Sequence, residues 1–181
     1  FTATALLTLA LCIGANTAIL SIVRSVLLRP LPVPEADRLM LVYDSYPNTG
    51  AVDGGASAPD YFDRLRAAPA FEALALYKRV PMTFGPAGGA ERLTGVRATP
   101  SFYRILGARP QAGRIFTDAE GGYGNHHVVL LSDGFWRRAY GGDRSIVGKI
   151  ITLNGSTYDV VGVMPPGFKY VWNDVDLWMP E

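Results

Sequence analysis

Phe1–Val23, FTATALLTLALCIGANTAILSIV, contains no charged side chain, and every Lys, Arg, Asp, Glu and His of the chain follows it. An α-helix rises about 1.5 Å per residue, so roughly 20 mostly apolar residues cross a hydrocarbon core of about 30 Å. The run therefore predicts a membrane-spanning helix, and we place this helix and its exit stalk at residues 1–28. We also expect residues upstream of Phe1, because the first residue is not Met.

Polar residues interrupt this apolar run at six positions: Thr2, Thr4, Thr8, Asn16, Thr17 and Ser21. Small and hydroxyl-bearing residues are common where transmembrane helices pack together, and this is our interpretation. The alternative is that the middle of the run lies near the headgroups, where these side chains meet water. A cleaved signal peptide is a rival for the whole segment. It would have a shorter apolar core, a charged region in front and an A-x-A-like site behind.

Basic residues follow the span at Arg24, Arg29 and Arg38. The positive-inside rule alone would place them in the cytoplasm. A basic stretch before Phe1 would reverse that orientation, so charge alone leaves the orientation open.

The composition of the chain excludes several classes of site. The net charge is +1, which gives no electrostatic footprint for nucleic acid, so we expect no nucleic-acid partner. The single cysteine, Cys12, lies in the apolar run, so neither an internal disulfide nor a thiolate zinc cluster is available. Three alternating prolines in Arg29–Pro34 predict a short, stiff, extended exit from the helix. The remaining residues, 35–181, have the length of one domain or of two small lobes.

Strand and helix patterns alternate after residue 35 and predict a mixed, largely antiparallel α+β domain. Helices are expected at Ala58–Ala67, behind the S-x-x-D capping box of Ser57 and Asp60; from Thr99 and Pro100 to Gly107; and from Ser132 to Gly141. Strands are expected at Leu39–Tyr46, Ala73–Phe84, Glu91–Ala98, Val128–Leu131, Lys149–Leu153 and Ser156–Val163. Gly85–Gly89 connects the second strand to the third, and Asn154-Gly155 is a strong hairpin signal between the last two.

The motifs that carry chemistry are absent or incomplete. Gly142–Ile150, GDRSIVGKI, superficially evokes a phosphate-binding loop, but Asp143 stands where the first glycine belongs and Ile150 where Ser or Thr would bind magnesium. We expect a turn leading into a strand there. His126 and His127 are adjacent, so on a strand they would point to opposite faces, and with Asp118 and Glu120 nearby they make only a weak metal site. Solvated loop residues are the better interpretation.

No G-x-S-x-G, H-E-x-x-H or EF-hand pattern occurs, and Asp60 and Asp63 are interpreted as a solvated helix face. Trp136, Trp172 and Trp178 either line a ligand groove or, as is more common, fill a core or an interface. We therefore predict no catalytic, cofactor-binding or metal-ligating residue and no cofactor.

Several short segments, taken together in their order and spacing, indicate a protein family more specifically than any one segment does. These segments are Gly14–Ile19, Leu27–Pro32, Phe102–Pro110, Gly113–Phe116, Val129–Ser132, Phe135–Arg138, Gly141–Lys149, Leu153–Gly155 and Val160–Phe168. Together they resemble the extracytoplasmic core domain of MacB-like, FtsX-type ABC transporter permeases, with its first transmembrane helix, in the form found in the large duplicated permeases typical of acidobacteria. The resemblance covers nearly the whole chain.

The resemblance implies a fold, a location relative to the inner membrane and a set of partner proteins. The first helix would leave the cytoplasm through the inner (plasma) membrane, and residues after about 30 would be an extracytoplasmic core domain, 35–181, of two lobes. The first lobe would begin with Leu39–Tyr77, and the rest would form mostly the second. A separate ABC ATPase would hydrolyse ATP and drive a permease homodimer or a paired permease half, with a periplasmic adaptor as a further partner. The outer domain would transmit this motion for export, and the chain itself would not be an enzyme.

Two other classes of protein remain as alternatives. One is a single-pass membrane-anchored binding or scaffold module of the cell envelope, with Trp and Tyr residues as its contact surface. The other is a membrane-tethered hydrolase, for which every motif tested is missing. The identity of the cargo does not follow from the residues.

Overall fold

The structure is a computed structural model that describes residues 1–26, 33–46, 51–85, 89–122, 124–168 and 172–181. Contacts divide the chain into two units, Phe1–Met40 and Leu41–Glu181, and each is described by itself. Most of the predicted extended exit, residues 29–32, and the centre of the predicted turn, residues 86–88, lie outside the described residues.

The first unit is dominated by helix α1 (Thr2–Val26), followed by the short 3-10 helix η1 (Ala36–Arg38). Within α1, Thr2–Ile22 has a mean hydropathy of 2.0 and is long and apolar enough to cross a membrane. The Thr8 hydroxyl donates to the Thr4 carbonyl at 2.9 Å, and the Thr17 hydroxyl donates to Ile13 at 2.8 Å. Because these hydroxyls bond within the helix, they can lie in lipid without water.

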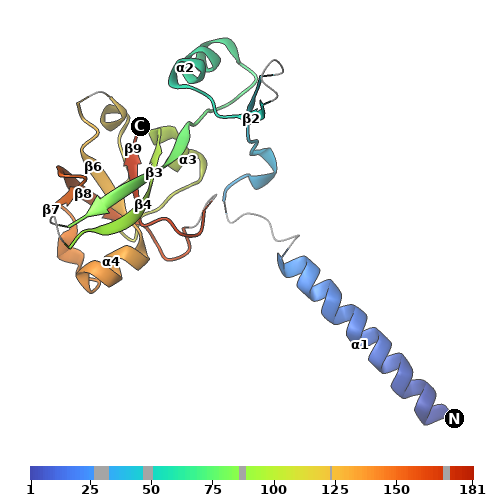
Figure 1. The fold of residues 1–181 in the computed structure, drawn as a ribbon. Coiled ribbons are helices and arrows are strands. Elements are labelled where there is room, and N and C mark those ends of the chain that lie inside the picture. The colour runs from blue at the N-terminus through green and yellow to red at the C-terminus, as the bar shows by residue number, and fades with distance from the viewer. Residues whose placement is uncertain (27–32, 47–50, 86–88, 123, 169–171) are drawn as a thin grey trace. The chain divides into compact units, whose positions relative to one another are not determined.

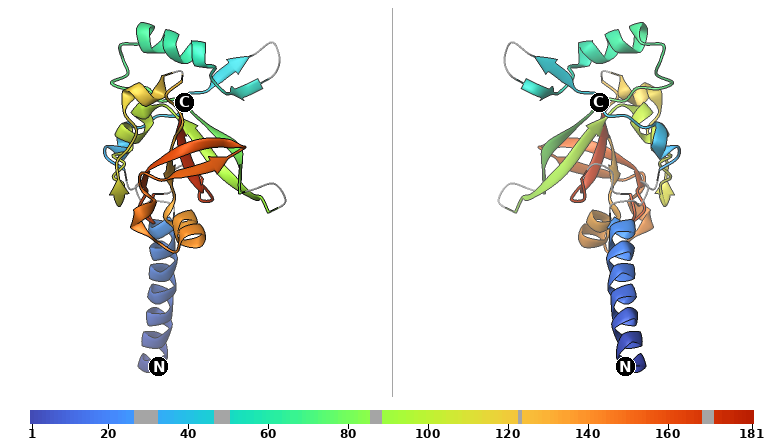
Figure 2. Two further views of the ribbon diagram at one scale, coloured as in Figure 1. Left: turned by 90° about the vertical axis from the view of Figure 1, so that its left-hand side faces the viewer. Right: turned by 90° about the vertical axis from the view of Figure 1, so that its right-hand side faces the viewer.

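The second unit is built on one large sheet that closes on itself (Figures 1 and 2). Its strands are β3 (Tyr77–Phe84), β4 (Glu91–Ala98), β5 (Ala112–Gly113), β6 (Val128–Leu131), β7 (Ile150–Leu153), β8 (Ser156–Val163) and β9 (Leu177–Pro180). Their order is β5-β8-β6-β9-β4-β3-β7, and β7 also pairs with β8. The pairs β6–β8 and β4–β9 are parallel and the others are antiparallel, which confirms the predicted mixed α+β fold.

Smaller elements complete this unit. They are the two-stranded sheet of β1 (Asp44–Tyr46) and β2 (Ala51–Gly54), the helices α2 (Ala58–Ala67), α3 (Pro100–Ile105) and α4 (Asp133–Tyr140), and the 3-10 helices η3 (Asp118–Gly121) and η4 (Arg144–Ile146). We call residues 41–76, which contain β1, β2 and α2, the small lobe.

The core of the large sheet is apolar. All four residues of β6 are buried, and Val129 and Leu131 pack in one cluster with Leu93, Leu153 and Leu177. Helix α4 adds Phe135, whose ring meets Phe84 edge to face at 5.2 Å. Full burial of one such side chain stabilises the fold by about 1.5–3 kcal/mol, so this cluster is the main source of stability.

The hairpin between β7 and β8 forms as predicted, and its turn also closes the sheet. Asn154 and Gly155 have φ angles of 49° and 78°, as a two-residue type I′ turn requires. The Asn154 Oδ1 accepts from the Thr83 backbone N–H at 2.8 Å, and the Asn154 N–H donates to the Thr83 carbonyl at 2.9 Å. These two bonds extend the single β3–β7 pair, Phe84 with Leu153.

Helix starts are predicted well. Ser57 and Asp60 form the expected capping box, and the Ser132 hydroxyl accepts from the Phe135 N–H at 3.1 Å. Thr99 stands at the N-cap of α3, but its side chain does not cap the helix. Its Oγ1 instead accepts from the Leu76 N–H at 3.1 Å, which ties the small lobe to α3.

Three predicted strands are too long. Leu39–Tyr46 is a strand only at Asp44–Tyr46, because β2 pairs only with that end. Ala73–Phe84 begins as a strand at Tyr77, where β4 starts to pair with it. Lys149 lies outside β7. In the first two cases the side-chain pattern extends further than the backbone partner, and a strand requires the partner. Lys149 still has a partner, because its carbonyl accepts from the Val160 N–H at 2.9 Å.

The tight approach of β5 to β8 yields a stability prediction. Gly113 has a φ of +74°, and a Cβ there would lie 2.2 Å from the Val161 carbonyl oxygen. Gly148 also has a positive φ, +86°, but a Cβ there meets nothing within 4 Å. We expect Gly148→Ala to lower the free energy of unfolding by about 1–2 kcal/mol through backbone strain alone. Gly113→Ala should lower it by about 1–3 kcal/mol more, because its Cβ also overpacks the contact with β8. Urea unfolding of the two variants measures this difference, and equal losses would contradict the described contact.

Candidate functional site

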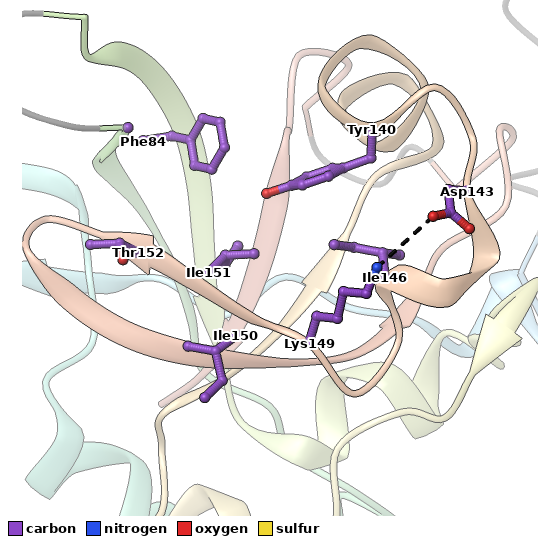
Figure 3. A pocket seen from close by; sticks show the side chains of 9 residues that line it. Phe84, Tyr140, Asp143, Ile146, Lys149, Ile150, Ile151 and Thr152 are labelled. Atoms are coloured by element: carbon purple, nitrogen blue, oxygen red, sulfur yellow. Dashed lines mark ion pairs between the residues drawn. The ribbon is translucent and has the colours of Figure 1, made fainter.

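A cavity of about 530 Å³ lies where η4 and β7 approach the end of α4 (Figure 3). Its lining is mostly apolar and includes Phe84 of β3, Tyr140 of α4, Ile146 of η4 and Ile151 of β7. Partial burial raises the pKa of the Tyr140 hydroxyl, so this group stays protonated at neutral pH. The cavity offers an apolar surface with a phenol at one side.

The charged groups at this cavity belong to the turn predicted from GDRSIVGKI. Asp143 Oδ1 accepts from the Ser145 N–H at 2.8 Å, and Asp143 Oδ2 accepts from the Ser145 hydroxyl at 2.6 Å. The Lys149 ammonium donates to Ser145 Oγ at 2.7 Å and lies 3.9 Å from Asp143. The hydrogen bonds from Ser145 lower the pKa of Asp143. The Ser145 N–H and the Lys149 ammonium are therefore already engaged within the turn, and the turn leads into β7 as predicted.

A second cavity, of about 560 Å³, lies at the start of α4 and is lined by Phe168, Trp172 and several charged residues. Its carboxylates are already paired. Asp133 lies 2.9 Å from Arg137, Asp176 lies 3.1 Å from Arg138, and Asp174 pairs with Arg79. The hydrogen bond from Arg137 lowers the pKa of Asp133. Arg79 of β3 and Arg138 of α4 thus link these elements to the loop before β9, whereas the pair of Asp133 and Arg137 lies within α4.

The three tryptophans have different environments. Trp136 is buried, and its indole N–H donates to the Asp143 carbonyl at 2.9 Å. Trp178 is also buried and packs edge to face on Phe168, with ring centroids 5.3 Å apart. Trp172 is half-buried and contacts Tyr77. Trp136 and Trp178 therefore fill the core, and of the three tryptophans Trp172 is the one that lines either of the two cavities described above.

The two histidines lie in a loop, which agrees with their interpretation as loop residues. They precede β6 rather than lying on a strand, so strand alternation does not separate them, and their ring centroids are 4.8 Å apart. His127 Nδ1 lies 3.0 Å from the Thr157 carbonyl, and the His127 ring stacks on Tyr158. Burial and the neighbouring His127 lower the pKa of His126. In the part of the chain that the structure describes, no group of three or more His, Cys, Asp or Glu is placed to hold a metal ion.

The paired carboxylates of α2 have structural roles. Asp60 Oδ2 accepts from the Ser57 N–H at 3.1 Å and from the Ser57 hydroxyl at 2.6 Å, and these bonds lower its pKa. Asp63 is exposed and pairs with Arg66 at 2.9 Å. Glu120, near the histidines in sequence, accepts two hydrogen bonds from Arg114. The residues considered for chemistry are thus held in caps, turns and ion pairs.

The long-range connections were not predicted from the sequence. Arg138 joins Glu91 at 2.7 Å and Asp176 at 3.1 Å, across more than 35 positions of chain. The Leu74 carbonyl accepts from the Ser101 hydroxyl at 2.7 Å and from the Tyr61 hydroxyl at 3.4 Å. No local motif marks such partners, because an exposed Arg or Ser suits many neighbours.

Comparison with known proteins assigns a family to this fold. A family profile described as "MacB-like periplasmic core domain" matches residues 2–181. No curated protein sequence matches the chain.

Two solved structures are similar in fold. One is the extracellular domain of the noncanonic ABC-type transporter YknZ from Gram-positive bacteria, at 17% identity with a TM-score of 0.54, over 67% of this chain and 60% of that one. The other is the periplasmic region of MacB from Actinobacillus actinomycetemcomitans, at 12% identity with a TM-score of 0.54, over 76% of this chain and 61% of that one. The chain thus spans about three fifths of the length of the solved domains it matches.

The tryptophan environments yield a prediction. Trp136→Phe removes the indole N–H that bonds the Asp143 carbonyl and shrinks a buried side chain, so we expect it to lower the free energy of unfolding by about 1–3 kcal/mol. Trp172→Phe is the matched control, since Trp172 is only half-buried, and should cost less than about 1 kcal/mol. Chemical denaturation measures both. A greater loss in the Trp172 variant would contradict the assignment of Trp136 to the core.

Proposed function

This chain belongs to the family of MacB-like periplasmic core domains, and we propose that its outer domain couples ATP-driven motion of membrane helices to substrates or partner proteins outside the membrane. The observation that carries the proposal is the extent of the family match, which includes both the apolar helix and the sheet domain in one continuous stretch. The protein would then serve as a permease subunit of an export or mechanotransmission system.

The described residues suit a mechanical role. Helix α1 runs for 25 residues without a proline, so an axial or tilting movement at one end reaches the other. The large sheet closes on itself around one apolar core and can move as a rigid body. The residues considered for chemistry are held in structural contacts, which fits a subunit that transmits motion and leaves catalysis to another protein.

The partners follow from the family. We propose a separate ABC ATPase, a permease homodimer or a paired permease half, and a periplasmic adaptor. In this arrangement residues 1–28 form the membrane helix and its exit stalk in the inner membrane. Residues 35–181 lie outside the membrane as the core domain. ATP hydrolysis would take place on the ATPase.

The alternative of a single-pass binding or scaffold module has less support. It relied on Trp and Tyr residues as a contact surface; Trp136, Trp178 and Tyr103 are buried, whereas Tyr43 is 56% exposed. Trp172 alone of the tryptophans lines a cavity, and its cavity is bordered by paired charges.

The lever role of α1 is tested by breaking the helix near its end. Ile22→Gly with Val23→Gly should uncouple ATP hydrolysis from export, because glycine destabilises a helix by about 1 kcal/mol per position and lets it absorb the movement. Assembly and ATP hydrolysis of the whole transporter should persist, while export should fall to that of a strain lacking the gene. The matched control, Ile22→Ala with Val23→Ala, keeps the helix and should export normally. Unchanged export in the glycine variant would refute the lever role.

The orientation is tested by labelling from outside the cell. Ile150 is exposed on β7, so Ile150→Cys presents one aqueous thiol in a background in which every natural cysteine of the polypeptide, Cys12 included, is replaced by Ala. We expect a membrane-impermeant maleimide to label it in intact cells, or in cells with a permeable outer membrane. Labelling only after the inner membrane is broken would reverse the proposed orientation.

A further inference from the structure

The cavity beside Tyr140 has a buried apolar floor and aromatic walls (Figure 3). Ile146 and Ile151 form the floor, with exposed fractions of 4% and 5%. Phe84 and Tyr140 form the walls; they are half-buried, and their ring centroids lie 6.1 Å apart. The cavity volume of about 530 Å³ falls within the range of small-molecule sites, which is about 300–1,000 Å³. The size and the lining thus suit a small ligand with an apolar body.

The Lys149 ammonium lines the same cavity and can donate further hydrogen bonds. An ammonium has three N–H groups, and within the described ranges one of those of Lys149 is engaged, by Ser145 Oγ at 2.7 Å. The nearby Tyr140 hydroxyl stays uncharged at neutral pH, because burial raises its pKa. Lys149 therefore supplies the positive charge that a ligand in this cavity would meet.

The Asp143 carboxylate, which also lines the cavity, is already engaged. Its two oxygens accept from the N–H and the hydroxyl of Ser145, at 2.8 Å and 2.6 Å, and Lys149 lies 3.9 Å away. A ligand ammonium at Asp143 would therefore meet the like charge of Lys149. Residues 142–149 contain one carboxylate and two cationic side chains, so the net charge of this turn is +1. Charge and hydrogen bonding both favour a ligand whose polar group is a negatively charged acceptor.

We propose that this cavity binds a small apolar carboxylate, a molecule with an apolar body and one carboxylate group. The carboxylate would accept a hydrogen bond from the Lys149 ammonium, and the apolar body would lie on Ile146 and Ile151. Burial of the apolar body would supply most of the affinity, and Lys149 would select the charge of the ligand. This inference does not depend on the proposed export role.

The position of Lys149 gives the bound ligand a direction. Figure 3 shows Lys149 and Phe84 on opposite sides of the Tyr140 ring. A ligand with its carboxylate at Lys149 can therefore extend along Tyr140 toward Phe84. Aromatic rings pack well edge to face or with an offset, so an aromatic group at the far end of the ligand suits these two walls. A phenyl ring on a short aliphatic acid has this shape.

The test follows isoleucine methyl NMR signals of the full-length natural polypeptide in nanodiscs. The probe is 4-phenylbutyrate, and 4-phenylbutanol and 4-phenylbutylamine are its neutral and cationic counterparts. We expect 4-phenylbutyrate to shift the δ1 methyl signals of Ile146 and Ile151 and to leave those of Ile105 and Ile115, which do not line the cavity, unchanged. The dissociation constant should be about threefold lower for the acid than for the alcohol, as for an exposed ion pair, and highest for the amine.

Two variants test the role of Lys149. Lys149→Met removes the charge and keeps an apolar stem of similar length, so it should weaken binding of 4-phenylbutyrate to the level of 4-phenylbutanol. Arg144→Met is the matched control, because Arg144 is an exposed cation of the same turn that does not line the cavity. It should change the dissociation constant of the acid by less than about twofold, since salt screens an exposed charge that does not contact the ligand.

Each other outcome overturns the proposal. Unchanged Ile146 and Ile151 signals up to the solubility limit of 4-phenylbutyrate would mean that the cavity does not take this ligand. Similar shifts of all four isoleucines would identify partition into the bilayer or the protein surface without a site. An acid that binds no better than the alcohol or the amine would refute the assigned charge. Equal weakening by Lys149→Met and Arg144→Met would refute a direct contact of the carboxylate with Lys149.

Discussion

The contact between Asn154 and Thr83 is the constraint on which the large sheet depends. One hairpin residue both makes the turn from β7 to β8 and bonds the backbone of β3 through its side chain and its N–H. Without these bonds β3 and β7 would share only the pair of Phe84 and Leu153. The ring of strands closes only if β3 and β7 meet. The apolar cluster inside the ring and the packing of α4 on Phe84 require the same meeting of β3 and β7.

In this closed domain the candidate residues for chemistry form hydrogen bonds and ion pairs that hold the fold together. Asp143 and Ser145 shape the turn before β7, and Trp136 anchors that turn through its indole N–H. Exposed ion pairs contribute little stability individually, but here they link elements far apart in the chain, such as α4 with β4 through Arg138 and Glu91. A domain held in this way transmits displacement better than a loosely packed one.

Local signals in the sequence predicted much of this fold, and non-local pairing accounts for what they missed. The Ser57–Asp60 capping box, the Ser132 cap and the Asn154-Gly155 turn are decided by neighbours within four residues, and the structure confirms all three. Strands β2, β5 and β9 were missed, since Ala51–Gly54, Ala112–Gly113 and Leu177–Pro180 are short and acquire strand geometry only from their partners β1, β8, β4 and β6. Leu39–Tyr43 shows the reverse case, a strand pattern whose backbone partner is absent from the described residues. Among the residues considered for chemistry, the closeness of the two histidines and the contact of Trp172 with Tyr77 were not predicted, because they depend on tertiary contacts.

Sheet closure also bears on how copies of this domain coexist. Proteins anchored in a bilayer diffuse in two dimensions, so their outer domains meet more often than the same domains dilute in solution. Open strand edges then pair between molecules and lead to aggregation. In this sheet β7 joins β8 to β3, and the side of β3 away from β4 carries Pro81, which has no N–H to offer a neighbouring strand. The ring of strands therefore leaves few open edges in the large sheet through which copies of this domain could aggregate.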